Sequence, residues 1–307
     1  SLELLKDALA TRENNSSFIS FFKQEVSNSS LKDSTKRNHL STLLLLQEFK
    51  RDIVFSDLTF EFVSSFEYFL QQKGYHTNTI AKHMKHLKRH INIAINKEYI
   101  EIQKYAFRKY KIKTVENKHT HLVPEELEQL ERLSLTGKHM KLQKSLDAFL
   151  FCCYAGMRYS DFTNLSKKNI VDINQETWLI YKSVKTGTEV RLPLYLLFAG
   201  KGIVILNKYR NNLEDFFRLR DNSNINKDLI IIAKLAGLSK KISFHTARHT
   251  NATLLIYNGV NITTVQKLLG HKSVKTTQVY ANIMDITLVR DLEKAIYSKA
   301  GGKHKGN

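Results

Sequence analysis

Proline occurs only twice in this chain of 307 residues, at positions 124 and 193. Because proline interrupts helix interiors, such a sequence can form long, unbroken helices. In the first half, the segments 17–26, 33–50, 59–73 and 77–97 repeat apolar residues at three- and four-residue spacing, the pattern of amphipathic helices. We expect Gly74 to end the third helix and Thr77 to cap the fourth. Residues 1–107 are therefore predicted to form a helical domain.

The fourth of these segments carries opposed apolar and basic faces. Its apolar stripe consists of Ile80, Met84, Leu87, Ile91 and Ile95. The opposite face is predicted to carry Lys82, Lys85, His86 and Arg89, with no acidic residue among them. A solvated outer face is the simpler interpretation of such a charge run. The excess of cations favours a DNA-binding surface.

The charge of the whole chain limits its partners. There are 48 lysines and arginines against 29 acidic residues, a formal net charge of +19. Nucleic acid is the leading candidate partner, and an anionic membrane surface is the second. We find no apolar run of the roughly 20 residues that a membrane span needs, and the first residues do not resemble a signal peptide.

The only cysteines, Cys152 and Cys153, are adjacent and predicted to be reduced core residues, which fits a cytoplasmic protein.

The second half begins after a basic segment. Residues 108–120 are predicted to be a linker, and Pro124, followed by two glutamates, to start a helix. A long helix is expected through 144–154. Strands near 178–181 and 190–192 flank a glycine-containing turn at 185–188, and helices resume after Leu194. We therefore expect a mainly α protein with a small β-sheet, in which a mixed α/β domain spans 121–300 and a disordered tail spans 301–307.

Four clusters in this second domain contain residues suited to phosphate chemistry. Each has an ordinary structural interpretation when taken alone, such as a helix cap or a solvated turn. The clusters contain Arg158 with Asp161; Lys185 at the hairpin turn; His245 and Arg248 behind the cap residue Ser243; and His271, which Tyr280 follows after nine residues. His245 and Arg248 share a helix face because they are three residues apart. Gly270 is predicted to end one helix and Ser273 to cap the next, and His249 is expected to be structural.

Together and in this order, the clusters resemble the tyrosine recombinase family of phage and transposon integrases. The family pattern is Arg, Lys, His-x-x-Arg, His or Trp, then Tyr, and every position is filled here. The resemblance covers about 120–300 with high specificity. The helical first half resembles the family's core-site-binding domain with lower specificity. The turn at Lys185 is similar to that of integrases from Bacteroidetes mobile elements.

The resemblance implies a role for each residue. Tyr280 would attack a DNA phosphate and form a 3′-phosphotyrosyl bond, with His245 as its base or hydrogen-bonding partner. Lys185 would protonate the departing 5′ oxygen, and Lys182 is the alternative for this role. Arg158 and Arg248 would stabilise negative charge on the phosphate, and His271 would donate a hydrogen bond to the phosphate. Asp161 would hold Arg158 in position. Two guanidiniums can replace a metal in such a reaction, so we predict no metal and no cofactor.

The resemblance also implies partners and a location. We expect three kinds of partner: double-stranded DNA with core recombination sites, further copies of this chain in a tetramer on DNA, and accessory DNA-bending proteins. The expected location is the bacterial cytoplasm close to the nucleoid and away from membranes. The amphipathic segment 287–298 could pack on its own domain or on a neighbouring subunit. Whether an arm-site-binding domain precedes residue 1 is open. The alternative functions are a type IB topoisomerase-like enzyme and a catalytically silent DNA-binding regulator.

Overall fold

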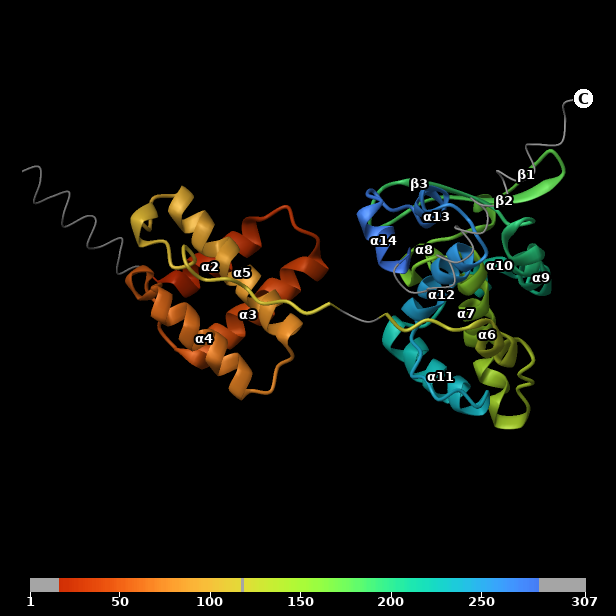
Figure 1. The fold of residues 1–307 in the computed structure, drawn as a ribbon, viewed down its shortest axis with the longest axis horizontal. Helices are drawn as coiled ribbons and strands as arrows, with labels where there is room; N and C mark the ends of the chain where they lie inside the picture. The colour runs from red at the N-terminus through yellow and green to blue at the C-terminus, as the bar shows by residue number, and fades with distance from the viewer. Residues whose placement is uncertain (1–16, 117–118, 282–307) are drawn as a thin grey trace, which may run out of the picture. The chain divides into compact units, whose positions relative to one another are not determined.

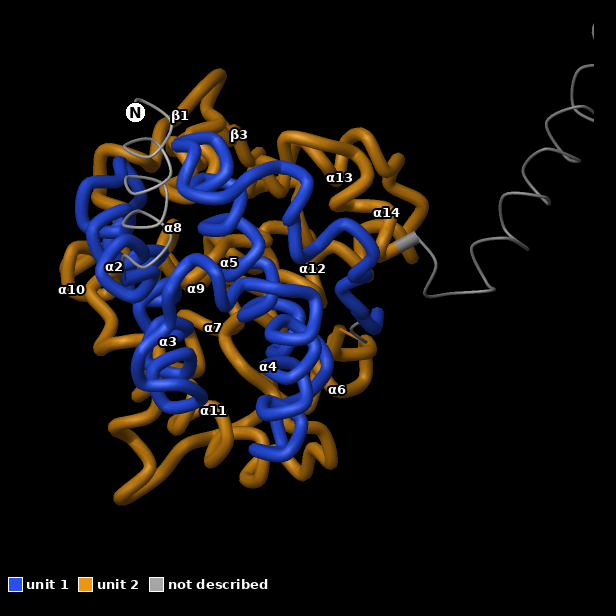
Figure 2. The backbone as a smooth tube through the Cα atoms, turned by 90° about the vertical axis from the view of Figure 1, so that its left-hand side faces the viewer, with its two compact units in different colours: residues 1–117 blue, residues 118–307 orange. Residues whose placement is uncertain are grey.

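The computed structural model describes residues 17–116 and 119–281. The chain forms two compact units, residues 1–117 and residues 118–307, which are coloured separately in Figure 2. The boundary falls within the segment 108–120 that the sequence predicts to be a linker. Each unit has its own hydrophobic core, and we describe each by itself.

Unit 1 is built from helices, as predicted (Figure 1). They are α2 (Phe18–Asn28), α3 (Asp33–Phe49), α4 (Phe60–Gln72) and α5 (Thr77–Asn96), with short 3₁₀ turns at Phe55–Asp57 and Ile102–Lys104. Gly74 adopts a positive φ of 75° just after α4 and allows the chain to turn. The predicted cap at Thr77 is wrong by one residue: His76 occupies the cap position, without a side-chain hydrogen bond, and Thr77 is the first helical residue.

The interface between α3 and α5 contains a cluster of histidines. His39, His83 and His90 are each less than 5% exposed, and His86 is half-buried. His39 Nδ1 lies 3.2 Å from His90 Nε2, and Thr42 Oγ1 lies 2.8 Å from Nδ1 of both His83 and His86. Burial, assisted by the charges of nearby cations, lowers the pKa of His83 and His86 to about 4 and that of His90 to about 3. These rings are therefore neutral at pH 7.

We expect unit 1 to lose stability in mild acid. In the unfolded chain these histidines protonate near pH 6.5, whereas in the folded chain they resist protonation until about pH 4 or below. Their contribution is present above pH 6.5 and is lost progressively as the pH falls from about 6.5 towards 4. Circular-dichroism melts of the whole chain at pH 8, 6 and 5 would measure the loss. In His90→Phe the pH dependence should be weaker than in wild type.

Unit 2 combines helices with one small sheet (Figure 1). Its first half contains α6 (Pro124–Glu131), α7 (Gln143–Ala155), α8 (Tyr159–Phe162), β1 (Ile170–Ile173), β2 (Glu176–Lys182) and β3 (Glu189–Pro193). Its second half contains α9 (Lys201–Lys208), α10 (Leu213–Phe217), α11 (Asn222–Leu235), α12 (Phe244–Tyr257), α13 (Ile262–Leu269) and α14 (Lys275–Ala281). Short 3₁₀ turns lie at Gly137–Leu142, Lys167–Asn169 and Leu197–Gly200. The mainly α fold with a small sheet is confirmed.

The sheet is an antiparallel meander in the order β1-β2-β3. The predicted hairpin is β2 with β3, in the register Tyr181 opposite Val190 and Lys182 opposite Glu189. Strand β1 was not predicted, because it has only four residues and lacks a clear alternation of buried and exposed positions. On β2, Leu179 and Tyr181 are buried while Lys182 is exposed, so this strand has one face towards the core.

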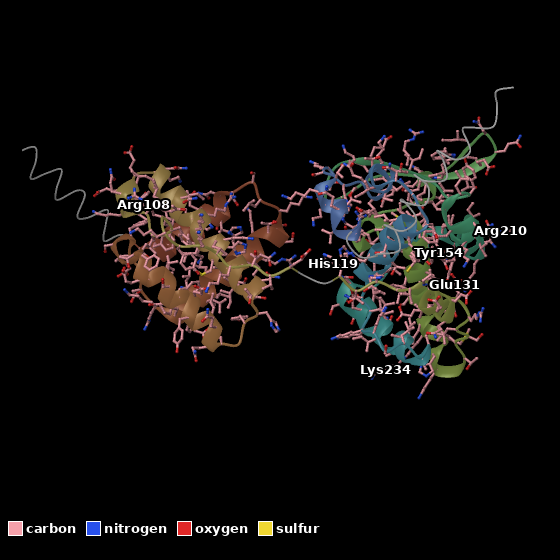
Figure 3. All side chains as sticks on the ribbon, in the orientation of Figure 1. Arg108, His119, Glu131, Tyr154, Arg210 and Lys234 are labelled. Carbon is pink, nitrogen blue, oxygen red and sulfur yellow. The ribbon has the colours of Figure 1, made fainter. Side chains whose placement is uncertain are left out.

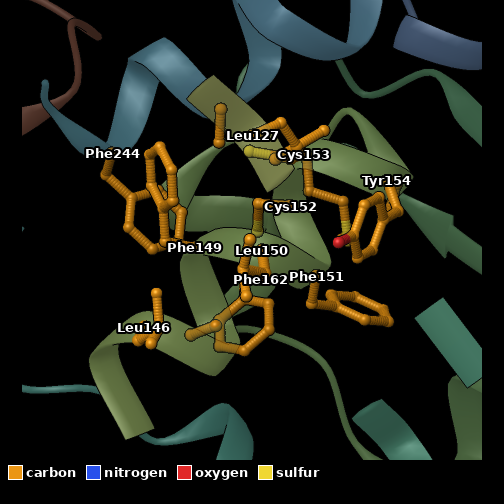
Figure 4. Packing of buried hydrophobic residues seen from close by; sticks show 14 of the residues in the cluster. Leu127, Leu146, Phe149, Leu150, Phe151, Cys152, Cys153, Tyr154, Phe162 and Phe244 are labelled. Carbon is orange, nitrogen blue, oxygen red and sulfur yellow. The ribbon is translucent and has the colours of Figure 1, made fainter. Parts of the chain in front are cut away.

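Helix α7 forms the centre of the unit 2 core. Every residue from Ser145 to Ala155 is buried, and α12 packs along it. Cys152 and Cys153 are fully buried free thiols, whose pKa burial raises well above its usual value (Figure 4). Near the end of α7, the Tyr154 hydroxyl donates to Glu131 Oε1 at 2.7 Å, and both residues are labelled in Figure 3. A central helix this apolar holds its carboxyl end firmly in place, and the candidate site begins at that end.

Over the residues that the structure describes, no helix has the length and apolar character to cross a membrane.

Candidate active site

The first arginine of the site lies where α7 ends. Gly156 closes α7 in the left-handed conformation with φ 66°, and an added Cβ would lie 2.6 Å from Asn251 Oδ1. Glycine is therefore required there on both backbone and steric grounds. Arg158 follows at the cap position of α8, with its side chain 13% exposed. Its Nη1 lies 3.4 Å from Asp161 Oδ2 and donates to Ser183 Oγ at 3.2 Å.

Asp161 connects this arginine to the hairpin. Its carboxylate is fully buried and accepts the Val184 backbone N–H at 2.8 Å and the Ser183 hydroxyl at 3.3 Å. One buried carboxylate thus holds Arg158 on one side and the start of the β2–β3 turn on the other. A buried carboxylate with this many partners fixes the positions of Arg158 and of the turn, because the loss of any one partner leaves part of the buried charge uncompensated.

Arg248 is fully buried, with 1% exposure. Its Nη1 donates to the Gly156 carbonyl at 2.8 Å and its Nη2 to the Leu269 carbonyl at 2.7 Å. These carbonyls lie at the carboxyl ends of α7 and α13, where backbone acceptors lack helical partners and the helix dipole favours a cation. Burial and the neighbouring Arg158 lower the pKa of Arg248 to about 10, so it remains charged at neutral pH.

His245 lies in the first turn of α12. Ser243 occupies the cap position, as predicted, and its backbone N–H donates to Thr246 Oγ1 at 3.0 Å. The histidine remains exposed at the surface. Partial loss of hydration and the positive charges of Arg248 and Arg158 lower its pKa to about 4. The ring is therefore neutral at pH 7 and has a lone pair with which it can accept a proton.

Two lysines were considered for the hairpin, and the structure distinguishes their positions. Lys182 is the last residue of β2, paired with Glu189 across the strands. Lys185 is exposed in the turn, where Ser183 N–H donates to the Thr188 carbonyl at 2.9 Å. The charge of Lys185 contributes to the lowered pKa of both His245 and His271, whereas that of Lys182 does not. Lys185 is thus the lysine whose charge acts on both histidines of the site.

The turn is also tied to the segment that carries the second histidine. Thr186 Oγ1 donates to the Gly270 carbonyl at 3.2 Å. Gly270 ends α13 in the left-handed conformation, as predicted, and His271 follows it, 8% exposed. His271 Nδ1 lies 2.9 Å from Thr277 Oγ1, and burial together with Arg248 lowers the pKa of this histidine to about 3. The ring is neutral and held by the helix that follows.

Tyr280 lies on that next helix, α14, and is 6% exposed. The Ser273 hydroxyl accepts the Lys275 N–H at 3.3 Å, where α14 begins. Burial raises the pKa of the phenol, while the positive charges of Arg248 and Arg158 act against the rise. The two guanidiniums therefore act on Tyr280 and on both histidines, which brings five residues scattered between 158 and 280 into one electrostatic neighbourhood.

Gly270→Ala should disturb this neighbourhood more than an ordinary glycine substitution. Gly270 has φ 63°, and an added Cβ would lie 2.6 Å from Val190 Cγ2. Gly237 has a similar φ of 74° with nothing within 4 Å of an added Cβ, so Gly237→Ala isolates the backbone strain. We expect Gly270→Ala to lower the free energy of unfolding by about 1–3 kcal/mol more than Gly237→Ala, the usual range for overpacking. Denaturant melts of both variants measure the difference, and equal losses would contradict it.

The predicted DNA-binding residues of α5 are not equivalent. Lys85 and Arg89 are exposed and Lys82 is half-buried. His86 departs from the prediction of a common outer face: its ring stacks on His39 with centroids 4.0 Å apart, and its Nδ1 contacts Thr42. The reason is that α5 packs against both α3 and α4, so its buried sector is wider than the apolar stripe alone indicates.

Several residues of the site carried no recognisable sequence signal. Ser183 and Thr277 hold Arg158 and His271, and Asn251 donates to the carbonyls of Cys153 and Tyr154 at the end of α7. His249, expected to be structural, lies beside Tyr280 with ring centroids 5.5 Å apart. Serine, threonine and asparagine are too common for their positions to stand out without the fold.

Comparison with known proteins agrees with this arrangement. The model of the phage integrase family matches residues 120–285, which is more than half of the chain. The chain belongs to the phage integrase family. The model of the phage integrase SAM-like domain matches residues 17–112, the helices of unit 1. Both matches agree with the resemblance to tyrosine recombinases that the sequence motifs carry.

Named relatives of this integrase-family chain are tyrosine recombinases. A tyrosine recombinase of Pseudothermotoga lettingae is 31% identical over 169 residues, which cover 53% of this chain and 56% of the relative. Tyrosine recombinase XerC of Rickettsia bellii is 28% identical over 176 residues, covering 54% and 55%. The chain thus spans a little over half the length of these relatives.

Solved structures share the fold at low sequence identity. A lambda integrase dimer bound to a COC′ core site has a TM-score of 0.72 at 17% identity and covers 87% of this chain and 95% of that chain. The Tn1549 transposon integrase in complex with a circular intermediate DNA has a TM-score of 0.72 at 16% identity and covers 91% of this chain and 99% of that chain.

The predicted amphipathic segment 287–298 and tail 301–307 lie outside the described residues.

Proposed function

We propose that this chain is a site-specific DNA recombinase that cleaves and rejoins DNA strands through a 3′-phosphotyrosyl bond to Tyr280. The observation that carries the proposal is the convergence of Arg158, Arg248, His245 and His271 around a buried tyrosine. Membership of the phage integrase family supports the same reaction. Unit 1 would bind the core site, unit 2 would catalyse, and the segment 108–120 would link them.

The two arginines would stabilise the transition state. Attack on a phosphodiester adds negative charge to the non-bridging oxygens, and guanidinium N–H groups match those oxygens in charge and geometry. Arg248 keeps N–H donors beyond the two that its carbonyl partners occupy. Donors fixed in this way contribute about 3–4 kcal/mol each to catalysis, which is comparable with a metal ion's part in other phosphoryl transfers. We therefore propose metal-independent chemistry without a cofactor.

Tyr280 would be the nucleophile and His245 its proton acceptor. The phenol oxygen attacks phosphorus, the phenol proton passes to the neutral imidazole, and the bond to the 5′ oxygen breaks. His271 would donate its Nε2–H to the phosphate, while its Nδ1 is held by the Thr277 hydroxyl. Burial raises the pKa of Tyr280, and the charges of Arg248 and Arg158 oppose this rise because they stabilise the phenolate, which favours the attack.

Lys185 would protonate the departing 5′ oxygen. Its turn is held on one side by Asp161 through Val184 and on the other by Gly270 through Thr186. The lysine is thus carried by a turn with two fixed anchors, whereas Lys182 lies on the strand before it. The phosphotyrosyl bond retains the energy of the broken ester, so a 5′ hydroxyl from a second duplex can rejoin the strand without ATP.

The remaining partners follow from this function. Lys82, Lys85 and Arg89 would contact the DNA backbone, while His86 would contribute mainly to the packing of unit 1. The lambda integrase has been solved as a tetramer bound to a Holliday junction, and we propose a tetramer on DNA for this chain. The proposed setting is the bacterial cytoplasm at the nucleoid.

Covalent capture tests the proposal. Duplexes with a randomised central segment and one nick are incubated with the protein in EDTA, denatured, and recovered through the attached protein. We expect a captured consensus and a phosphotyrosyl peptide that contains Tyr280. Failure to capture any duplex would favour a silent DNA-binding regulator. Relaxation of a plasmid that carries the captured sequence, without strand exchange between two such duplexes, would favour a topoisomerase.

A further inference from the structure

The residue after Arg248 makes contacts that the proposed reaction does not use. His249 lies on α12 and is 8% exposed. Its ring lies 5.5 Å from the Tyr280 ring between centroids, at an interplanar angle of 51°. It also meets the edge of His245 at 4.5 Å and stacks on His119 at 4.4 Å with an angle of 24°. One imidazole therefore touches the candidate nucleophile, the candidate base and a residue from the end of the linker.

His119 belongs to the segment where the linker enters unit 2, and it is labelled in Figure 3. The backbone of this segment is fixed along α12, because the Leu122 N–H donates to the buried Thr250 hydroxyl at 2.9 Å. Lys240 Nζ donates to the His121 carbonyl at 3.2 Å on the other side. The segment that carries the His119 ring is therefore held by α12 and by Lys240.

Helix α14, which carries Tyr280, is held by packing. Its described residues, Lys275–Ala281, contact α12 and α13. The His249 ring lies against the phenol ring itself, so it limits how far the nucleophile can move.

The chemistry of His249 indicates that its ring matters more than its nitrogens. Its Nδ1 is buried and has no hydrogen-bond partner among the residues that the structure describes. Burial and the nearby His245 and His119 lower its pKa to about 3, so it is neutral at pH 7 and does not act as a cation towards phosphate. What the residue offers to its neighbours is a flat ring, which offset and edge-on packing with other rings stabilises.

We infer that His249 and His119 are positioning residues for the nucleophile: the linker end docks His119 on His249, and the His249 ring seats Tyr280 for attack. The inference rests on the proposed function only for its kinetic consequence. The seating of α14 is a property of the folded chain, with or without DNA. It assigns to the linker end a part in catalysis in addition to joining the two units.

Ring substitutions separate this role from its alternatives. In single-turnover cleavage of the captured duplex, we expect His249→Ala to be about 10–100-fold slower, since displacements of about 1 Å cost up to 10²-fold. His249→Phe should recover to within about fivefold of wild type, because a phenyl ring preserves the stack. His119→Ala should be about five- to tenfold slower, and His119→Phe close to wild type. DNA affinity and the pH at half-maximal rate should not change.

The neighbouring His121 provides a matched control. It lies in the same segment and has the same side chain, but no ring contact joins it to His249 or Tyr280 within the described part of unit 2, so His121→Ala should cleave at the wild-type rate. Cleavage by His249→Ala at that rate would overturn the inference. Equal defects in His249→Ala and His249→Phe would also overturn it, because they would assign the effect to a nitrogen.

Hydrogen exchange provides a readout that needs no cleavage. Amides of the peptide that covers 275–281 should exchange faster in His249→Ala and His119→Ala than in wild type or His121→Ala. If wild type forms no adduct while α14 loosens as described, the proposed function fails and the seating of α14 stands. If wild type forms the adduct and α14 exchanges equally in all four proteins, the inference fails and the proposed function stands.

Discussion

Tyr280→Phe should bind the captured duplex with unchanged affinity and form no covalent product. The substitution removes one oxygen atom and keeps the ring that packs against His249. Without the phenol oxygen there is no nucleophile, and the arginines and histidines around the phosphate have no attack to assist. Denaturing gels of protein incubated with nicked duplex should show the slow-migrating adduct for wild type only, a loss of at least about 10³-fold, within the range for removing a catalytic nucleophile.

Tyr257→Phe is the matched control for this experiment. Tyr257 lies at the end of α12 and is half-buried. Tyr257→Phe removes one hydroxyl, as Tyr280→Phe does, but from a residue outside the site. It should form the adduct at a rate close to that of wild type. Adduct formation by Tyr280→Phe would mean that another side chain attacks the phosphate, and the proposed mechanism would then be wrong.

The sequence predicted the parts of this molecule that depend on local patterns. Helix periodicity located α2 to α5, and the glycine-containing turn between apolar alternations located the β2–β3 hairpin. Caps were also readable: Gly270 ends α13 in the left-handed conformation, and Pro124 begins α6. Such signals lie within a few residues of each other, so no knowledge of the tertiary fold is needed to recognise them.

Contacts between distant segments could not be predicted in this way. The acceptors of Arg248 are the backbone carbonyls of Gly156 and Leu269, 92 and 21 residues away. A carbonyl has no sequence signature, and only the meeting of two helix ends creates the pair. The stack of His119 on His249 likewise joins the linker to α12.

His86 shows a different limit of periodicity. A single apolar stripe gives one buried direction, but α5 is covered by helices on more than one side. His83 and His90 are buried along with most of the stripe, and His86 is half-buried. Polar residues that pair with each other across α3 and α5 form part of the core of unit 1. A hydrophobic pattern does not identify them as core residues, because it counts only apolar side chains.

Burial also decides which arginine gives the clearer test of the proposed chemistry. Arg248→Ala would leave two helix-end carbonyls unpaired in the core, so lost activity and lost stability would be confounded. Arg158 is partly accessible and is held at the edge of the site by Asp161 and Ser183. Its removal takes one partner from the buried Asp161 carboxylate, which keeps the Ser183 hydroxyl and the Val184 N–H, and the core helices keep their caps.

We therefore expect Arg158→Ala to cleave about 10²–10³-fold more slowly than wild type, the usual effect of removing one preorganised donor, while most of its DNA affinity remains. Arg158→Lys should recover only part of the rate, since an ammonium cannot present the paired donors of a guanidinium. Arg248→Ala should show a comparable cleavage defect together with a lower melting temperature. Arg132→Ala, which removes the same charge from an exposed ion pair on α6, controls for the change in net charge. Wild-type cleavage by Arg158→Ala would contradict the view that two guanidiniums, acting together, stabilise the charge that develops on the phosphate.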